Sequence, residues 1–294
     1  MLNYFDSPVF EIPSKEAKNA GVRLLVKSEY LNHPFVSGNK WWKLKYNLEE
    51  ARKSGNRTLL TFGGAYSNHI YATAAAAKEL GLKSIGVIRG EKVLPLNSTL
   101  TFAGECGMQM HFVSREEYRK KLERSFVESL REKFGDFYLI PEGGSNTLAV
   151  KGCAEFAREK LSSTEFDYLC LPVGTGGTMA GIIAGLEGKK NIIGFSVLKN
   201  GSFLIDEVRK LQWEYSARDY PNWTLQTDYH FGGYAKQTPA LNEFILNMED
   251  QHHLSLDPIY TAKTVAGVFD LIERSYFSKG STILILHTGG LRPG

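Results

Sequence analysis

The sequence is poor in cysteine and has no two cysteines at a metal-binding spacing. Three cysteines occur in 294 residues, Cys106, Cys153 and Cys170, and none belongs to a C-x-x-C pair. This pattern indicates neither a disulfide framework nor a zinc site. We therefore expect reduced, mostly buried thiols, no bound metal and a cytoplasmic protein.

Long apolar runs and a strong charge of one sign are also absent. No stretch approaches the roughly 18 apolar residues of a membrane-spanning helix. The N-terminal segment lacks the basic region and apolar run of a signal peptide. The formal net charge is +3, from 35 Lys plus Arg against 32 Asp plus Glu, so we expect no binding to nucleic acid or to a membrane. Hydrophobic residues make up 43% and charged residues 23%, the balance of an ordinary globular protein.

What the chain does have is a regular alternation of short apolar runs and helical patterns. Strands are predicted at residues 58–62, 84–88, 110–113, 137–140, 168–173, 191–197 and 282–286. Helices are predicted at residues 41–54, 67–81, 96–106, 116–134, 148–161, 179–186, 241–251 and 262–276. Strands separated by helices of this length favour right-handed crossovers and mostly parallel sheets covered on both faces. The predicted fold class is α/β.

One segment breaks this alternation. Residues 212–238 are rich in Trp, Tyr, Asp and Gly and show neither the apolar run of a buried strand nor the spacing of a helix. Long irregular segments inside compact domains are often functional. We expect this one to form a loop, such as a wall of a pocket.

A glycine-rich segment with the form of a phosphate cradle follows the predicted strand at residues 168–173. It consists of Gly174, Thr175, Gly176, Gly177 and Thr178. Glycines allow close approach of a ligand to converging backbone N–H groups, and the threonine hydroxyls add donors. The segment lacks the Gly-Lys-Ser/Thr end of a P-loop and the spacing of a dinucleotide-binding fingerprint. A phosphate-bearing cofactor is favoured over ATP or NAD.

Three further polar clusters matter because ligands of open parallel sheets bind beyond the carboxyl ends of the strands. Residues 63–69 (GGAYSNH) and 287–290 (HTGG) follow predicted strands, and Lys40 precedes the first predicted helix. The helix start after residue 66 suits a carboxylate or phosphate, and a lysine near a phosphate site can become a Schiff-base nucleophile. Each cluster also has a plain structural alternative: a strand–turn–helix junction, a C-terminal turn and a solvated surface charge.

Six stretches, taken together and in order, resemble the fold-type II enzymes that use pyridoxal 5'-phosphate (PLP), the tryptophan synthase β family. More narrowly, they resemble its branch of 1-aminocyclopropane-1-carboxylate (ACC) deaminases and D-cysteine desulfhydrases. They span residues 37–291 and are SGNKWWKLKYNL, TFGGAYSNHIYATAAAAKELGL, PEGGSNTLAVKG, PVGTGGTMAGIIAGL, DPIYTAKTVAGVFDLI and HTGGL.

The resemblance implies PLP as the cofactor and assigns residues to it. Lys40 would hold PLP as a Schiff base. Lys43 and the loop of residues 174–178 would bind the phosphate. Asn68 would hydrogen-bond the ring 3'-oxygen, and Thr288 would meet the pyridine nitrogen.

For the substrate, the resemblance implies that Ser67 binds the carboxylate and that Tyr234 and Tyr260 face the reacting atoms. Two departures from the family pattern concern the same site. ACC deaminases carry a glutamate directly after the second tyrosine, where this chain has Thr261, and this favours the desulfhydrases. Tyr66 replaces the usual residue of the GGIQSN loop, and we expect it to reshape the substrate pocket.

The resemblance further implies two domains with the cofactor between them. A smaller α/β domain of residues 46–144 would be inserted into a larger one of residues 1–45 and 145–294. A homodimer is expected because relatives form one.

The implied activity is that of a lyase acting on a small amino acid. The main hypothesis is a D-cysteine desulfhydrase, which forms pyruvate, sulfide and ammonia. Alternatives are an ACC deaminase, which forms α-ketobutyrate and ammonia, a β-chloroalanine or serine lyase, and a non-catalytic protein that binds a phosphorylated ligand.

Overall fold

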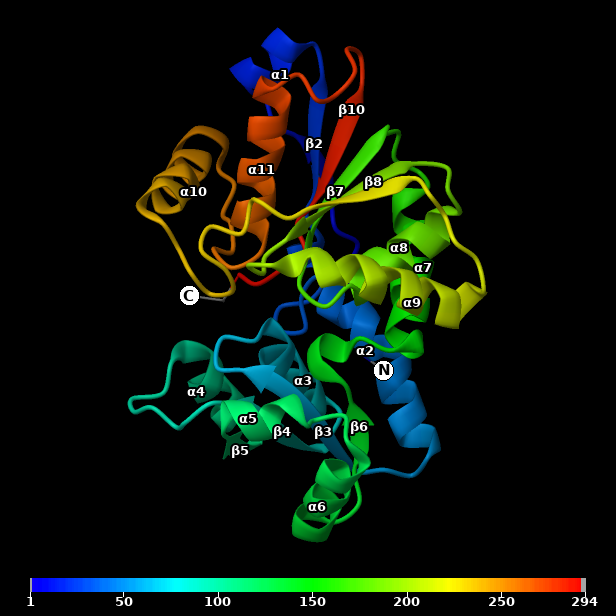
Figure 1. Cartoon of the computed structure of the whole chain (residues 1–294), viewed down its shortest axis with the longest axis vertical. Coiled ribbons are helices and arrows are strands. Elements are labelled where there is room, and N and C mark those ends of the chain that lie inside the picture. The colour runs from blue at the N-terminus through cyan, green and yellow to red at the C-terminus, as the bar shows by residue number, and fades with distance from the viewer. Residues whose placement is uncertain (1, 292–294) are drawn as a thin grey trace.

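Two β-sheets organise the chain, as a computed structural model describing residues 2–291 shows (Figure 1). The larger sheet has the strand order β1-β2-β10-β7-β8-β9, and only β1 runs antiparallel to its neighbour. Its strands are β1 (Val9–Glu11), β2 (Arg23–Lys27), β7 (Tyr168–Val173), β8 (Asn191–Ser196), β9 (Trp223–Gln226) and β10 (Thr282–Leu286). The smaller sheet is fully parallel, in the order β5-β4-β3-β6. Its strands are β3 (Thr58–Gly64), β4 (Lys83–Arg89), β5 (Gln109–Val113) and β6 (Tyr138–Ile140). The predicted α/β class is confirmed.

Helices cover both faces of the larger sheet. One face packs against α1 (Lys15–Ala20), α10 (Pro239–His252) and α11 (Thr261–Glu273), and the other against α2 (Asn39–Lys53), α7 (Thr147–Phe156), α8 (Gly177–Leu186) and α9 (Leu204–Ser216). The alternation of side chains along β10 explains this arrangement. Ile283 and Ile285 belong to a first core, between the sheet and α1, α10 and α11. Leu284 and Leu286 belong to a second core, between the sheet and α2, α7, α8 and α9, because successive strand residues point to opposite faces.

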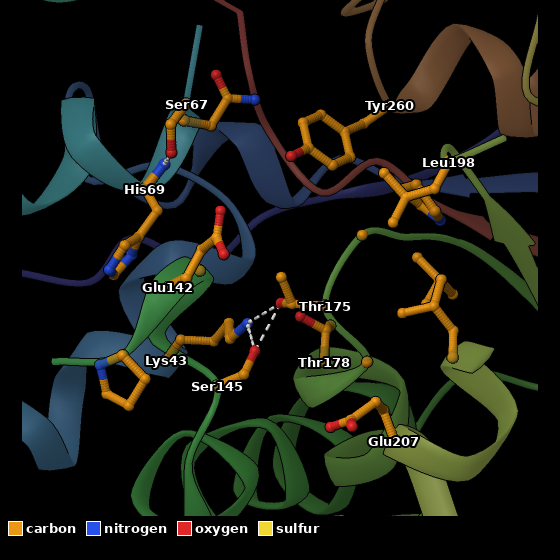
Figure 2. Close-up of a pocket in the computed structure, with 18 of the residues that line it drawn as sticks. Lys43, Ser67, His69, Glu142, Ser145, Thr175, Thr178, Leu198, Glu207 and Tyr260 are labelled. Atoms are coloured by element: carbon orange, nitrogen blue, oxygen red, sulfur yellow. Dashed lines mark hydrogen bonds between the residues drawn. The ribbon is translucent and has the colours of Figure 1, made fainter. Parts of the chain in front are cut away.

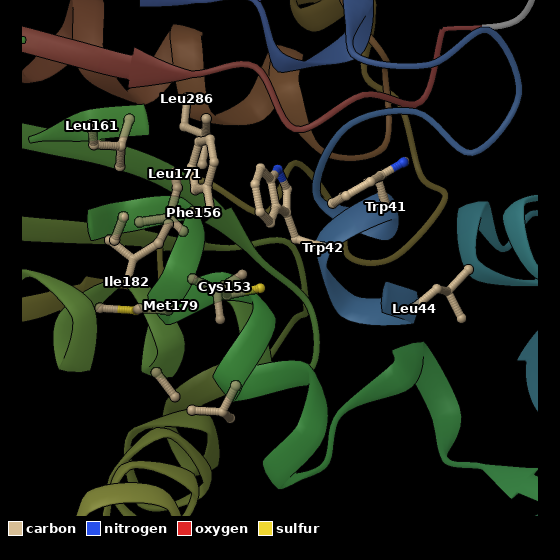
Figure 3. Packing of buried hydrophobic residues seen from close by; sticks show 14 of the residues in the cluster. Trp41, Trp42, Leu44, Cys153, Phe156, Leu161, Leu171, Met179, Ile182 and Leu286 are labelled. Carbon is tan, nitrogen blue, oxygen red and sulfur yellow. The ribbon is translucent and has the colours of Figure 1, made fainter. Parts of the chain in front are cut away.

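The start of α2 is anchored in the second of these cores (Figure 3). Trp41 and Trp42 pack edge to face with ring centroids 4.8 Å apart. The indole N–H of Trp42 donates to Glu29 Oε1 at 2.7 Å, so its buried polar atom is satisfied. The helix that begins with Asn39 and Lys40 is therefore fixed by large aromatic side chains directly after those residues.

The smaller sheet also has helices on both faces. They are α3 (Asn68–Glu79) and α4 (Ser98–Glu105) on one face, and α5 (Arg115–Arg119) and α6 (Arg124–Phe134) on the other. Short 3-10 segments lie at Glu29–Leu31, Glu142–Gly144 and Gly201–Phe203, and a π-helical turn, Ala157–Leu161, continues α7.

The structure corrects several details of the sequence prediction. The helix predicted over residues 116–134 is interrupted between α5 and α6. Leu122, which a continuous helix would place on the same face as the buried Tyr118, is 73% exposed. The segment 212–238, predicted as a loop, contains the end of α9 and strand β9. The elements β1, α1 and β2 and the start of α9 were not predicted.

Helix α2 runs across the predicted domain boundary at residues 45–46, and the boundaries themselves stay a prediction. No helix within residues 2–291 is long and apolar enough to cross a membrane.

Candidate active site

The carboxyl ends of strands from both sheets border one cavity of about 480 Å³ (Figure 2). Its volume lies in the range of ligand pockets, about 300–1,000 Å³. All predicted site residues but one line it: Lys40, Lys43, Ser67, Asn68, Gly174, Thr175, Gly176, Thr178, Tyr234, Tyr260 and Thr288. The exception is Gly177, which is buried as the first residue of α8. Residues far apart in the sequence thus meet in one cavity, while their individual roles stay predictions.

Lys40 lies in the first turn of α2 and is linked to the glycine-rich loop of residues 174–178 through its neighbour Asn39. Its Nζ donates to Asn39 Oδ1 at 2.7 Å, and Asn39 Nδ2 donates to Thr178 Oγ1 at 2.8 Å. Gly38 permits the close approach of the two chain segments, because a Cβ there would stand 1.9 Å from the carbonyl oxygen of Thr288. The lysine amine is therefore held at the junction of α2, α8 and the end of β10.

The loop of residues 174–178 leads into the N-terminus of α8, which no side chain caps. Gly176 has φ +79°, a left-handed conformation that suits glycine. At Gly177 a Cβ would lie 2.9 Å from Ser145 Oγ and 3.2 Å from Lys43 Nζ. The loop thus presents backbone N–H groups and the positive end of a helix dipole beside an ammonium group, which is the arrangement of an anion site.

Lys43 is the charged group of this anion site. Its side chain is buried, and its Nζ donates to Ser145 Oγ at 3.0 Å and to Thr175 Oγ1 at 3.5 Å. No acidic side chain within residues 2–291 forms an ion pair with it. Burial lowers the pKa of Lys43 to about 8. A buried ammonium without a carboxylate, next to an uncapped helix N-terminus, fits a phosphate group.

Ser67 caps helix α3 on the opposite side of the cavity. Its Oγ accepts from the backbone N–H groups of His69 at 3.2 Å and Ile70 at 3.3 Å. Because the hydroxyl oxygen serves as the acceptor in both bonds, its hydrogen can donate toward the cavity. The helix dipole adds positive potential there, so this end of α3 suits a carboxylate.

His69 is buried behind this helix end, and its tautomer is fixed by its partners. Thr61 Oγ1 donates to the carbonyl of Ile140 at 2.9 Å and therefore accepts from His69 Nε2 at 2.8 Å. Burial, with added repulsion from Lys43 and Lys40, lowers the pKa of His69 well below its ordinary value. The imidazole is thus neutral, with its proton on Nε2.

Tyr234 and Tyr260 pack edge to face, with ring centroids 6.1 Å apart. Burial raises the pKa of Tyr234 to about 12 and raises the pKa of Tyr260 well above its ordinary value. Both phenols are therefore protonated at neutral pH and can donate hydrogen bonds. Lys40 Nζ lies 5.9 Å from the centroid of the Tyr260 ring, and a Cβ on Gly174 would stand 3.1 Å from Tyr260 Cε1, so this phenol adjoins both the lysine and the anion site.

Asn68 and Thr288 come from different sheets. Asn68 begins α3, and Thr288 follows β10. The two segments touch near Gly290, where a Cβ would lie 2.5 Å from Asp257 Oδ2 and 2.7 Å from Asn68 Nδ2. Only a residue without a side chain, at φ +97°, allows this approach.

The site differs from the sequence prediction in two respects. Tyr66 is 52% exposed and is not among the described residues that line the cavity, so the expectation that it reshapes the pocket is wrong. Ser145, Asn39 and Arg89 line the cavity but were not predicted. A signal existed for Ser145, because it stands in a Gly-Gly-Ser-Asn sequence before a predicted helix.

Comparisons with known proteins agree with this geometry. Residues 1–289 match the family described as "Pyridoxal-phosphate dependent enzyme". A protein of Thermotoga maritima with the provisional name ACC deaminase is 35% identical over 285 residues, covering 92% of this chain and 89% of that protein. A mitochondrial bifunctional D-cysteine desulfhydrase/ACC deaminase of Arabidopsis thaliana is 32% identical, covering 92% and 73%.

A solved structure gives the same result. The crystal structure of an ACC deaminase homologue superimposes with a TM-score of 0.86 at 28% identity, covering 99% of this chain and 91% of that one. The hypothesis of a non-catalytic phospho-ligand binder is therefore set aside. With the family matched over nearly its whole length and an anion site that fits the phosphate of the cofactor, the chain belongs to the fold-type II PLP-dependent enzymes, in the branch of ACC deaminases and D-cysteine desulfhydrases, and is a PLP-dependent lyase of small amino acids.

Proposed function

We propose that this enzyme is a D-cysteine desulfhydrase, which converts D-cysteine and water to pyruvate, hydrogen sulfide and ammonia. The observation that carries the proposal is the hydrogen bonding of Thr261, the residue after Tyr260. Its hydroxyl donates to the carbonyl of Asp257 at 3.3 Å and accepts from the N–H of Asp257 at 2.8 Å. The residue after Tyr260 is thus a buried turn-forming threonine and not the glutamate that ACC deaminases carry there. The name of the plant relative supports a desulfhydrase activity in this branch.

The residues of the cavity divide into a set for the cofactor and a set for the substrate. Lys43 and the loop of residues 174–178 would hold the phosphate of PLP, Asn68 and Thr288 its ring, and Lys40 would hold it covalently. When bound, PLP supplies an electron sink at the Cα of the substrate. The protein supplies position and proton transfer.

For the substrate, Ser67 and the N-terminus of α3 would bind the carboxylate and set the orientation of Cα. The Nζ of Lys40, once released by the incoming amine, would remove the α-proton. Its bond to Asn39 Oδ1 limits where that amine can move.

The thiolate then leaves from Cβ, and a hydrogen-bond donor is needed for the negative charge on sulfur. Tyr260 and Tyr234 are suited to this task because their pKa values are raised. A phenol that keeps its proton at neutral pH can donate a hydrogen bond to the negative charge on the departing sulfur.

The test offers D-cysteine, L-cysteine and ACC in parallel to the purified, PLP-loaded protein. Sulfide and pyruvate from D-cysteine are expected, with loss of the reaction in Lys40→Ala. Lys18→Ala is the matched control, since Lys18 is exposed on α1. Sulfide from L-cysteine alone, or from neither cysteine, would contradict the proposal.

The second candidate is ACC deaminase, which is favoured by the names of several relatives, including the one that is 35% identical. Release of α-ketobutyrate from ACC, without sulfide from D-cysteine, would support it. In that case Thr261 does not hinder ring opening, and the base must be another residue.

A further inference from the structure

Lys263 is a buried ammonium group outside the cavity, one turn after Tyr260. Its side chain has no exposed surface. Its Nζ donates to the backbone carbonyl of His230 at 2.9 Å and to that of Gly233 at 2.8 Å. No acidic side chain within residues 2–291 forms an ion pair with it. Burial of a charge is unfavourable unless hydrogen bonds replace its hydration. Both hydrogen bonds of Lys263 go to one short loop.

The backbone of that loop, residues 229–235, contains several positive φ values in a row. Phe231 and Ala235 have φ values of +47° and +55°, and Gly232 and Gly233 have +90° and +112°. Residues with a Cβ rarely adopt positive φ and need support from their surroundings. Of the two carbonyls bound by Lys263, that of His230 lies at the start of this run of positive φ values, and that of Gly233 belongs to the residue directly before Tyr234.

Helix α11 holds the same loop at two further points on one face. The phenol of Tyr229 donates to Asp270 Oδ2. At Gly267 a Cβ would stand 2.9 Å from Tyr229 Cγ, so the loop lies directly against the helix. Lys263, Gly267 and Asp270 are spaced by four and three residues and share one side of α11. Lys263 is the member of this face nearest to Tyr260.

We propose that Lys263 is a positioning residue, which sets the place of Tyr234 in the active site by bonding the main chain of the loop that carries it. Tyr260 stands at the start of α11, so one helix end fixes both phenols, Tyr260 directly and Tyr234 through Lys263. A purely structural lysine would stabilise the fold without a specific effect on Tyr234.

The first experiment is hydrogen–deuterium exchange on the PLP-loaded protein, and it does not depend on any substrate. In Lys263→Met, which keeps the length of the side chain but removes the donors, amides of residues 229–236 are expected to exchange at least about tenfold faster. The matched control is Val268→Ala, a buried change on another face of α11. It is expected to leave exchange in this segment unchanged. If the Met variant does not fold, Lys263→Leu, which also lacks a donor, takes its place.

The second experiment is a double-mutant cycle on kcat/KM with D-cysteine, and this arm rests on the proposed function. Lys263→Met is expected to lower kcat/KM by about 10- to 100-fold, the loss typical of a misplaced catalytic group. If Lys263 acts through Tyr234, Lys263→Met combined with Tyr234→Phe is no slower than Tyr234→Phe alone.

Two results overturn the inference: unchanged exchange of residues 229–236 in Lys263→Met, or multiplicative losses in the cycle. A wild-type protein inactive on D-cysteine would count against the proposed function alone, and the exchange experiment would still decide the role of Lys263.

Discussion

Asn39 Nδ2 donates a hydrogen bond of 2.8 Å to Thr178 Oγ1, a residue 139 positions further along the chain. The amide orientation follows from the other bond of Asn39, because the ammonium of Lys40 can only donate and must therefore face Oδ1. One side chain thus couples Lys40, the lysine that we propose to hold the cofactor, to the loop that would bind the cofactor phosphate.

This coupling predicts a moderate loss of cofactor affinity in Asn39→Ala. Removal of the bond to Thr178 is expected to raise the dissociation constant of PLP about 5- to 10-fold, roughly 1 kcal/mol. Asn242→Ala, at an exposed position of α10, is the control. Titration followed by cofactor absorbance measures both variants, and equal affinities would contradict the prediction.

Two glycines with similar positive φ differ in what a Cβ would meet, and Gly38 also has ψ −144°, a conformation nearly restricted to glycine. Gly38 and Gly55 have φ +68° and +74°, but a Cβ on Gly38 would stand 1.9 Å from the carbonyl oxygen of Thr288, whereas nothing lies within 4 Å at Gly55. Gly55→Ala is expected to lower the free energy of unfolding by about 1 kcal/mol, the strain alone. Gly38→Ala is expected to lose more than about 3 kcal/mol. Urea unfolding measures the difference, and similar losses would show that the segment near Thr288 yields.

The parts of the site that could be predicted are those in which local backbone demands fix the residue type. The glycines of the loop at residues 174–178 and the Ser67 cap are examples, since a tight turn before a helix needs such residues wherever it occurs. The strand ends also follow from short apolar runs. Together these features located most of the cavity, though which residues touch the cofactor was implied only by resemblance.

The parts that could not be predicted depend on distant partners. Lys263 reads as one more charge on a helix until the structure places His230 and Gly233 against it, 33 and 30 residues earlier. Strand β2 has only three consecutive apolar residues between charged ones, too few to distinguish a strand from a helical turn. Helix α9 is different, because Leu204, Val208 and Leu211 repeat at helical spacing and the signal was present.

Tyr260→Phe tests the role of the phenol without changing the packing. The substitution removes only the hydroxyl, so PLP affinity is expected to stay within about twofold of wild type. Loss of a hydrogen-bond donor to the negative charge that develops on sulfur is expected to lower kcat by about 100- to 1,000-fold. Steady-state sulfide release measures kcat, and an unchanged value would move the donor role to another group.

The lowered pKa of Lys43 predicts how stability depends on pH. Its pKa is about 8 in the folded protein without ligand, because burial disfavours the charge, against 10.5 ordinarily. Between about pH 8 and 10 the unfolded chain therefore binds more protons, and this group makes the free energy of unfolding rise with pH by at most about 1.4 kcal/mol per unit. Lys43→Met removes that contribution, and it is expected to stabilise the ligand-free protein at pH 7 because no charge is buried.

Binding of a phosphate has the opposite dependence on pH. An anion favours protonated Lys43, so affinity is expected to fall as pH rises above 8, by about fivefold between pH 8 and 9. The suitable probe is 4'-deoxypyridoxine 5'-phosphate, which has no aldehyde to react with Lys40, so titration of Lys40 cannot mask the effect. Lys43→Met is expected to bind this probe about 10- to 100-fold more weakly at pH 7 and to show no such decline above pH 8. If the variant and the wild type decline equally, another group titrates, and Lys43 is not the cation that binds the phosphate.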